Sequence, residues 1–131
     1  MAVDFGERRV GVAVTDPEGR FALPLTTLER SSDRQVLERL VELAGEEGIE
    51  AWVMGEPRRL DGTIGAAAER TRRFAAKLEA RSGLPVRLVD ESLTSREAES
   101  RLRAAGIDPR RHPERIDQVA AQILLEQALR C

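Results

Sequence analysis

The fold of this chain is decided by the stretch AVDFGERRVGVAV at residues 2–14. Two apolar runs, residues 2–5 and 10–14, flank a tight connection at residues 6–9, and this arrangement predicts a β-hairpin. The second run is apolar throughout, which is typical of a strand covered on both faces of its sheet. Asp4 interrupts the first run. A carboxylate inside a central strand costs on the order of several kcal/mol to desolvate unless a cation or hydrogen-bond donors meet it, so Asp4 needs a partner.

The rest of the chain alternates strands and helices. A third strand is predicted at about residues 20–28, and its Pro24, which cannot donate a hydrogen bond to a neighbouring strand, places it at a sheet edge. The other predicted elements are a helix from the capping cluster 31–33 to about Gly48, a strand at 51–54 closed by residues 55–57, a helix from Thr63 to Gly83, a strand at 86–89, a helix opened by a capping box at 94–97 and ending at Gly106, and a helix from Pro113 to Leu129. Right-handed crossovers then predict an α/β fold, with a five-stranded mixed sheet of order 3-2-1-4-5 and helices on both faces, in a single domain spanning residues 1–131.

Three acidic residues far apart in the sequence are predicted to meet at one crevice. The strand order reverses at the first strand, and ligands of open α/β sheets bind near such a reversal, beyond the carboxyl ends of the strands. Asp4 lies near that end of the first strand, and Glu91 lies just beyond that end of the fifth. Asp117 borders the apolar stripe of the last helix, whose small Ala120 and Ala121 allow a close approach to the sheet.

Each acid taken alone also has a structural interpretation. Asp4 could accept hydrogen bonds from the turn at residues 6–9 or pair with Arg8. Glu91 and its neighbour Asp90 could be loop acids that stabilise a helix start, and Asp117 could do no more than stabilise the first turns of its own helix.

Three ionised carboxylates in one crevice would repel one another, which favours a bound divalent metal. Mg²⁺ or Mn²⁺ prefers carboxylate and water oxygens, and two such ions about 4 Å apart can activate a water and stabilise the leaving oxygen of a phosphodiester. This chemistry needs neither histidine nor cysteine, of which the chain has one each, His112 in a predicted loop and Cys131 at the end. The pattern predicts a metal-dependent nuclease with Asp4, Glu91 and Asp117 as catalytic and metal-binding residues.

Five sequence motifs in one order resemble a known family, and together they cover nearly the whole chain. They are Val3-Asp4-Phe5-Gly6, Val10-Gly11-Val12-Ala13, Gly55-Glu56-Pro57 with Asp61-Gly62-Thr63, Asp90-Glu91-Ser92-Leu93-Thr94-Ser95, and Asp117-Gln118-Val119-Ala120-Ala121-Gln122-Ile123-Leu124. The chain is thereby similar to the YqgF/RuvX family of bacterial pre-16S ribosomal RNA nucleases and Holliday-junction resolvase homologues. The resemblance implies a ribonuclease H-like fold, a role in maturing the 5′ end of 16S ribosomal RNA, and catalytic acids at Asp4, Glu91 and Asp117.

Two positions depart from the pattern of that family. An apolar residue is more usual where Glu56 stands, and arginine is more usual where Ser92 stands. Glu56 is either a fourth acid at the crevice or a solvated loop residue, and whether Asp90 joins the acidic site is also left open.

The basic residues are almost all arginines, and several fall in predicted loops or at a helix start that could rim the crevice. The candidates for gripping nucleic-acid phosphates are Arg8, Arg9, Arg58, Arg59, Arg110, Arg111 and Arg115. Helix-face arginines such as Arg70, Arg72 and Arg73 share the composition without the predicted location, so they are interpreted as surface residues.

Composition narrows the function classes. The net charge is −2, so any nucleic-acid surface must be a local patch, and three Phe, one Trp and no Tyr are too few for a base-stacking module. Without an apolar run of transmembrane length or a secretory signal, we expect a cytoplasmic, soluble protein. Two other functions are alternatives to the nuclease. A phosphotransferase of the actin-like or sugar-kinase type would need two such domains, while a catalytically silent RNA- or protein-binding assembly factor stays open. The sequence does not decide between RNA and branched DNA as the substrate, or between endonuclease and exonuclease action. It also leaves the oligomeric state open.

Overall fold

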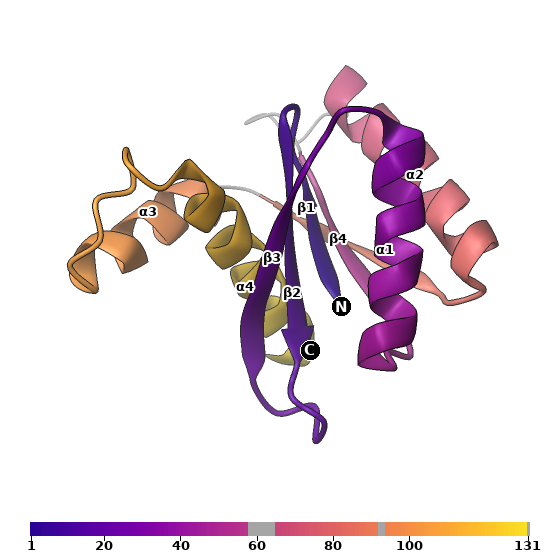
Figure 1. Cartoon of the computed structure of the whole chain (residues 1–131), viewed down its shortest axis with the longest axis horizontal. Coiled ribbons are helices and arrows are strands. Elements are labelled where there is room, and N and C mark those ends of the chain that lie inside the picture. The colour runs from indigo at the N-terminus through magenta and orange to yellow at the C-terminus, as the bar shows by residue number, and fades with distance from the viewer. Residues whose placement is uncertain (58–64, 92–93, 131) are drawn as a thin grey trace.

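The computed structural model describes residues 1–57, 65–91 and 94–130, and it has a five-stranded sheet between two helical layers (Figure 1). The strands are β1 (Ala2–Phe5), β2 (Arg9–Thr15), β3 (Ala22–Glu29), β4 (Trp52–Glu56) and β5 (Val86–Asp90). The helices are α1 (Asp33–Glu47), α2 (Ala66–Ser82), α3 (Thr94–Ala104) and α4 (Pro113–Arg130). The sheet order is β3-β2-β1-β4-β5, which confirms the predicted order. β2 runs antiparallel to β1 and β3, whereas β4 runs parallel to β1 and β5.

Helices cover both faces of the sheet, as predicted. Figure 1 shows α1 and α2 together on one side and α4 on the other. Since strand side chains alternate between faces, residues 2, 13 and 53 pack against α4. Their neighbours at 3, 12 and 54 pack into the cluster under α1 and α2. α3 packs against α4, where Ala98 is buried with Ala120 and Ile123.

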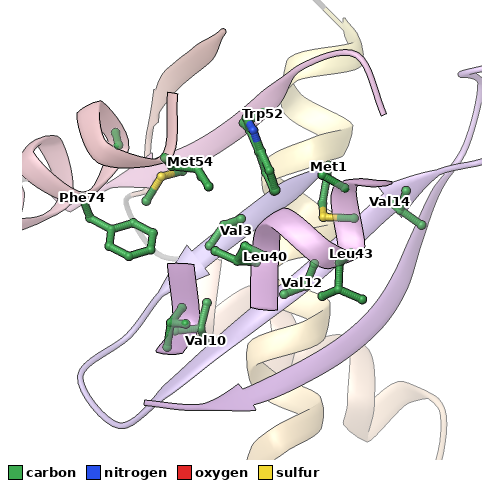
Figure 2. Packing of buried hydrophobic residues seen from close by; sticks show 14 residues of the cluster. Met1, Val3, Val10, Val12, Val14, Leu40, Leu43, Trp52, Met54 and Phe74 are labelled. Carbon is green, nitrogen blue, oxygen red and sulfur yellow. The ribbon is translucent and has the colours of Figure 1, made fainter. Parts of the chain in front are cut away.

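The larger core cluster lies on the α1 and α2 side of the sheet. Figure 2 shows the labelled side chains Met1, Val3, Val10, Val12, Val14, Leu40, Leu43, Trp52, Met54 and Phe74 gathered there. Trp52 is completely buried, and its indole Nε1–H donates to Ser82 Oγ at the end of α2, 2.9 Å away. The cluster packs the central strands of the sheet against α1 and α2.

Several predicted boundaries differ from the structure. The fourth strand does not close at residues 55–57 as predicted but continues through Glu56, because Gly55 and Glu56 pair with Val89 and Asp90 of β5. The predicted start of the second helix at Thr63 lies outside the described residues, and the described helix begins after Gly65. The edge position of the third strand is confirmed, with Pro24 opposite Ala13 beside a register shift. In the described ranges, no helix combines the length and apolar character needed to cross a membrane.

Candidate active site

Asp4, Gly11 and Gly55 form one row across the three central strands. Asp4 is paired with Gly11 between β1 and β2. Val3 is paired with Met54 between β1 and β4, and Gly55 follows one residue further along. Residues 2, 13 and 53, each two positions away in the same strand, pack against α4, so by alternation this row faces α4 as well. The row places a carboxylate between two positions that have no side chain.

The two glycines leave room for the neighbours of Asp4. A Cβ on Gly11 would lie 2.0 Å from the main-chain oxygen of Asp117, so the backbone of α4 rests directly on the sheet there. A Cβ on Gly55 would lie 2.6 Å from Oε2 of Glu91. Sequence reasoning did not assign these glycines a role. The available signal was a glycine inside an otherwise apolar strand, which often marks a close approach of another group.

Asp4 and Glu91 are hydrogen-bonded to each other through their carboxyl groups. Asp4 is only 9% exposed. Burial raises the pKa of both groups, and the adjacent Asp4 carboxylate raises the pKa of Glu91 further, to about 10. At neutral pH Glu91 therefore keeps its proton and donates it to the Asp4 carboxylate, because two buried like charges in contact are strongly unfavourable. The structural alternative of an Asp4 partner in Arg8 is not observed.

Besides Asp4, two neighbours fix Glu91 at the end of β5. Its main-chain N–H donates to the carbonyl of Glu56 at 3.1 Å, and the buried Thr94 hydroxyl hydrogen-bonds to its side chain. Thr94 is already the first residue of α3, so its hydroxyl supports Glu91 rather than opening the helix as the predicted capping box required. Of the two acids at this strand end, Glu91 faces the crevice, and Asp90 is exposed opposite Glu56 in β5.

Asp117 lies beside this acid pair but is bonded to a cation of the chain itself. Arg9 Nε donates to Asp117 Oδ2 at 2.7 Å. Burial raises the pKa of Asp117, the Arg9 guanidinium opposes this shift, and the charge of Asp4 adds to it. Across residues 1–57, 65–91 and 94–130, no three His, Cys, Asp or Glu side chains are gathered closely enough to form a ready-made metal-binding group. The predicted meeting of three acids is thus direct for Asp4 and Glu91, while the Asp117 carboxylate is engaged by Arg9.

Glu56, which the sequence left open between a fourth acid at the crevice and a solvated loop residue, is buried. It is 3% exposed at the end of β4, and both of its carboxylate oxygens accept hydrogen bonds from Arg72 of α2, at 2.6 and 3.2 Å. The expectation of a solvated loop residue is wrong, because β4 continues through this position and carries the side chain under α2.

A pocket of about 210 Å³ opens next to the acid pair. Its lining residues are Asp4, Phe5, Gly6, Glu7, Arg30, Pro57, Ala67, Arg70, Thr71 and Glu91. Sequence reasoning missed Arg30 and interpreted Arg70 as a surface residue of a helix. The signal that could have identified them is topological, since Arg30 follows β3 and Arg70 begins the second turn of α2, at the end of the sheet where Asp4 lies.

The described arginines among those predicted to bind nucleic acid lie on different parts of the molecule. Arg8 is exposed in the β1–β2 connection, and Arg115 is exposed in the first turn of α4. Arg58 and Arg59 lie outside the described residues. Arg110 and Arg111 are highly exposed and paired with Asp108, and Arg110 lines a separate hollow between α3 and α4. Among the described residues, the arginines that line the pocket beside Asp4 are Arg30 and Arg70, and nucleic-acid contacts of the predicted arginines stay a prediction.

Comparison with known proteins agrees with this architecture. A "Putative pre-16S rRNA nuclease" of Chloroflexus aurantiacus is 41% identical over 129 residues, covering 98% of this chain and 84% of the relative. A protein of the same name from Maridesulfovibrio salexigens is 40% identical over 126 residues, covering 96% and 93%.

Solved structures of low sequence identity share the fold. RuvC of Thermus thermophilus in complex with a Holliday junction substrate superposes with a TM-score of 0.62 at 15% identity, covering 98% of this chain and 90% of that one. A further structure of T. thermophilus RuvC gives a TM-score of 0.57 over 97% of this chain and 91% of its own. The predicted ribonuclease H-like fold is confirmed by these likenesses. The family model described as RuvX, Holliday junction resolvase, matches residues 1–131, and with the two relatives it shows that this chain belongs to the RuvX family.

Proposed function

We propose that this protein is a metal-dependent nuclease that hydrolyses phosphodiester bonds during maturation of the 5′ end of pre-16S ribosomal RNA in the cytoplasm. The observation that carries the proposal is the hydrogen-bonded pair of the buried Asp4 and the half-buried Glu91, at the carboxyl ends of β1 and β5. A protein would not retain two carboxyl groups in contact in a buried site for stability, since their desolvation opposes folding. Carboxyl pairs with strongly shifted pKa values are typical of catalytic sites.

The donor set fits a hard divalent cation. Carboxylate oxygens are the preferred protein ligands of Mg²⁺ and Mn²⁺, and the proton that Glu91 shares with Asp4 marks where a cation would relieve the same repulsion. Asp4 and Glu91 would hold the metal, and Asp117 would join them when its carboxylate leaves Arg9. When bound, the metal supplies an activated water and charge stabilisation at the phosphate.

The chain's own residues prepare this site. Thr94 and the main chain of Glu56 hold Glu91 in place, so the carboxylate is oriented before any ligand arrives. Gly11 and Gly55 allow the acids to approach one another. Arg9, close to Asp117, is placed to move from that carboxylate to a substrate phosphate, whose oxygens a guanidinium binds in the same geometry.

The RNA substrate is supported by the names of the two relatives, both of which are called "Putative pre-16S rRNA nuclease". A Holliday-junction endonuclease is the second candidate, favoured by the description of the family and by the RuvC likeness. A silent binding protein is disfavoured by the acid pair itself.

The test compares purified wild type with Asp4→Asn and Glu91→Gln on a pre-16S 5′ fragment, an unrelated single-stranded RNA and a four-way DNA junction, each with Mg²⁺, Mn²⁺ or chelator. The matched control is Glu50→Gln, which neutralises an exposed acid outside the pocket. We expect metal-dependent cleavage by wild type and control, and a loss of about 100-fold or more in both site variants while their circular dichroism stays native. Equal cleavage by a folded Asp4→Asn variant would refute the proposal. Cleavage of the junction alone would replace RNA by branched DNA as the substrate.

A further inference from the structure

The pocket beside the acid pair is lined by residues of both charges. Asp4, Glu7 and Glu91 are its acids, and Arg30 and Arg70 are its described arginines. Neither arginine belongs to the basic loops identified from the sequence. Arg30 directly follows β3, and Arg70 lies on α2, so two separate elements contribute positive charge to one small volume.

Arg30 is held in a fixed orientation. Its side chain is only 15% exposed, and its guanidinium carbon lies 4.0 Å from the ring centroid of Phe5. Phe5 is in turn stacked on Phe74 of α2 with a centroid separation of 4.2 Å. Arg30 Nη1 donates to the carbonyl of Gly6 at 2.8 Å, and Nε donates to Asp33 at 2.9 Å. A side chain this constrained loses little conformational entropy when it binds a ligand.

Arg30 also retains donors for a ligand. A guanidinium has five N–H groups. Within the described part of the chain, its hydrogen bonds take one N–H from each nitrogen, the last being a long contact of 3.5 Å from Nη2 to Asp33. One N–H remains on each Nη nitrogen, at a residue that lines the pocket.

Arg70 provides a second, unengaged cation. It is exposed at the pocket rim and makes no ion pair with any residue in the described ranges. Arg110 and Arg111 differ in that both are paired with Asp108 away from this pocket. Among the described residues that line the pocket, Arg30 and Arg70 are therefore the two that carry positive charge.

We propose that Arg30 and Arg70 form a phosphate-binding site that holds the nucleic-acid backbone next to the acid pair, on the α2 side of the pocket. This inference rests on the proposed nuclease function for the identity of the ligand. Guanidinium forks bind phosphate oxygens through paired hydrogen bonds, and the cations offset the repulsion between the acids and an approaching strand. Such a site positions the sugar-phosphate backbone of the nucleic acid and makes no sequence-specific contact with its bases.

The test measures binding rather than cleavage. A fluorescent single-stranded RNA is titrated with the Asp4→Asn chain, alone and carrying Arg30→Gln, Arg70→Gln or both, over a series of salt concentrations. Arg20→Gln and Arg39→Gln are matched controls, since both arginines are exposed and paired with surface acids outside the pocket. Each site variant is expected to raise Kd and to reduce the slope of log Kd against log salt by about 0.7, the value for one phosphate contact on a single strand. The controls are expected to leave the slope unchanged. Slopes equal to that of the parent chain in both site variants would overturn the proposal.

A second comparison separates phosphate binding from a structural role of Arg30 in the β1–β2 turn. Arg30→Lys keeps the positive charge and loses the paired donors, so we expect a higher Kd with a nearly unchanged salt slope. A purely structural role would instead lower Tm in both Arg30 variants and leave the slope of each unchanged. Arg70 is exposed, so its variant should keep the parent Tm and still lose slope.

The outcomes also distinguish this inference from the nuclease proposal. If the wild type cleaves RNA but the arginine variants keep the parent slope, the phosphate site is wrong and the nuclease stands. If no substrate is cleaved but the slopes fall as expected, the phosphate site stands and the nuclease is wrong.

Discussion

At the scale of single residues, two missing side chains decide whether the acid pair can exist. Gly11 and Gly55 flank Asp4 across the sheet, and the space of their absent Cβ atoms is taken by the backbone of Asp117 and by the carboxyl group of Glu91. The apolar residues around them stabilise the sheet, while the glycines leave the space in which Glu91 and Asp117 approach Asp4.

Replacing Gly11 by alanine should strongly destabilise the protein. The new Cβ would meet the Asp117 carbonyl oxygen at 2.0 Å, so α4 must shift as a whole, and we expect a loss of about 3 kcal/mol in the free energy of unfolding. Gly45→Ala is the control, because Gly45 is an exposed residue of α1 with open space around it, and it should gain about 0.5–1 kcal/mol. Urea denaturation measures both, and equal effects would show that α4 does not rest on Gly11.

The shared proton of Glu91 predicts a pH dependence of stability in the absence of metal. In the folded chain the pKa of Glu91 is raised to about 10, against a usual value of 4.5. Between these values the folded state binds more protons than the unfolded state, so stability is greatest below the lower value and falls as pH rises through this range. The slope is at most about 1.4 kcal/mol per pH unit for one proton. Thermal unfolding of Glu91→Gln should show a flatter pH profile than wild type, and a wild-type stability that rises from pH 5 to 9 would contradict the assignment.

At the scale of elements, a small hydrogen-bond cluster ties the fourth strand to the end of α2. Ser82 Oγ accepts from the indole of Trp52 and from the main-chain N–H of Leu84, and it donates to the carbonyl of Leu78 at 2.6 Å. Because Trp52 is completely buried, its N–H has no access to water as a substitute. The cluster therefore fixes how β4 meets the helix that forms one side of the pocket.

Ser82→Ala should cost about 1–3 kcal/mol, since it leaves the buried indole N–H without an acceptor. Ser100→Ala is a suitable control because Ser100 is exposed on α3, and its effect should stay within about 0.5 kcal/mol. Chemical denaturation followed by the fluorescence of Trp52 reports both variants. A neutral Ser82→Ala would mean that the indole finds another partner.

At the scale of the whole molecule, the site links folding, protons and cations. Without metal, the acid pair opposes folding through desolvation and the folded chain retains a proton to limit that cost. A cation that binds only the folded state replaces the proton and adds stability that depends on its concentration.

Mg²⁺ or Mn²⁺ should raise Tm, and the rise should grow with pH because a cation competes with the Glu91 proton. At 100 times Kd the expected gain is about 2.7 kcal/mol. Differential scanning fluorimetry at pH 6 and 8, with chelator as reference, measures it. Asp4→Asn should abolish the shift, whereas the distant Glu50→Gln should keep it; a shift retained by Asp4→Asn would place the cation elsewhere.

The sequence by itself determined the architecture and the identity of the acids that were expected to act. Apolar runs and capping residues predicted the strands and helices, and right-handed crossovers between them predicted the strand order. Pro24 predicted the edge strand, and Asp4 stood out because a charge in a buried strand needs a partner. These are local properties, since burial pattern and backbone chemistry are written in adjacent residues.

Only the tertiary structure decided which side chains contact one another at the site. Three contacts depend on strand register and helix docking, and they join residues 16 to 108 positions apart. They are the bonds of Glu91 to Asp4, of Arg9 to Asp117 and of Arg72 to the buried Glu56. The same docking put Arg30 and Arg70 on the pocket wall and left Arg110 on another surface. Side chains of one composition acquire different roles because distance and desolvation, which set the strength of charge interactions, exist only once the elements are packed together.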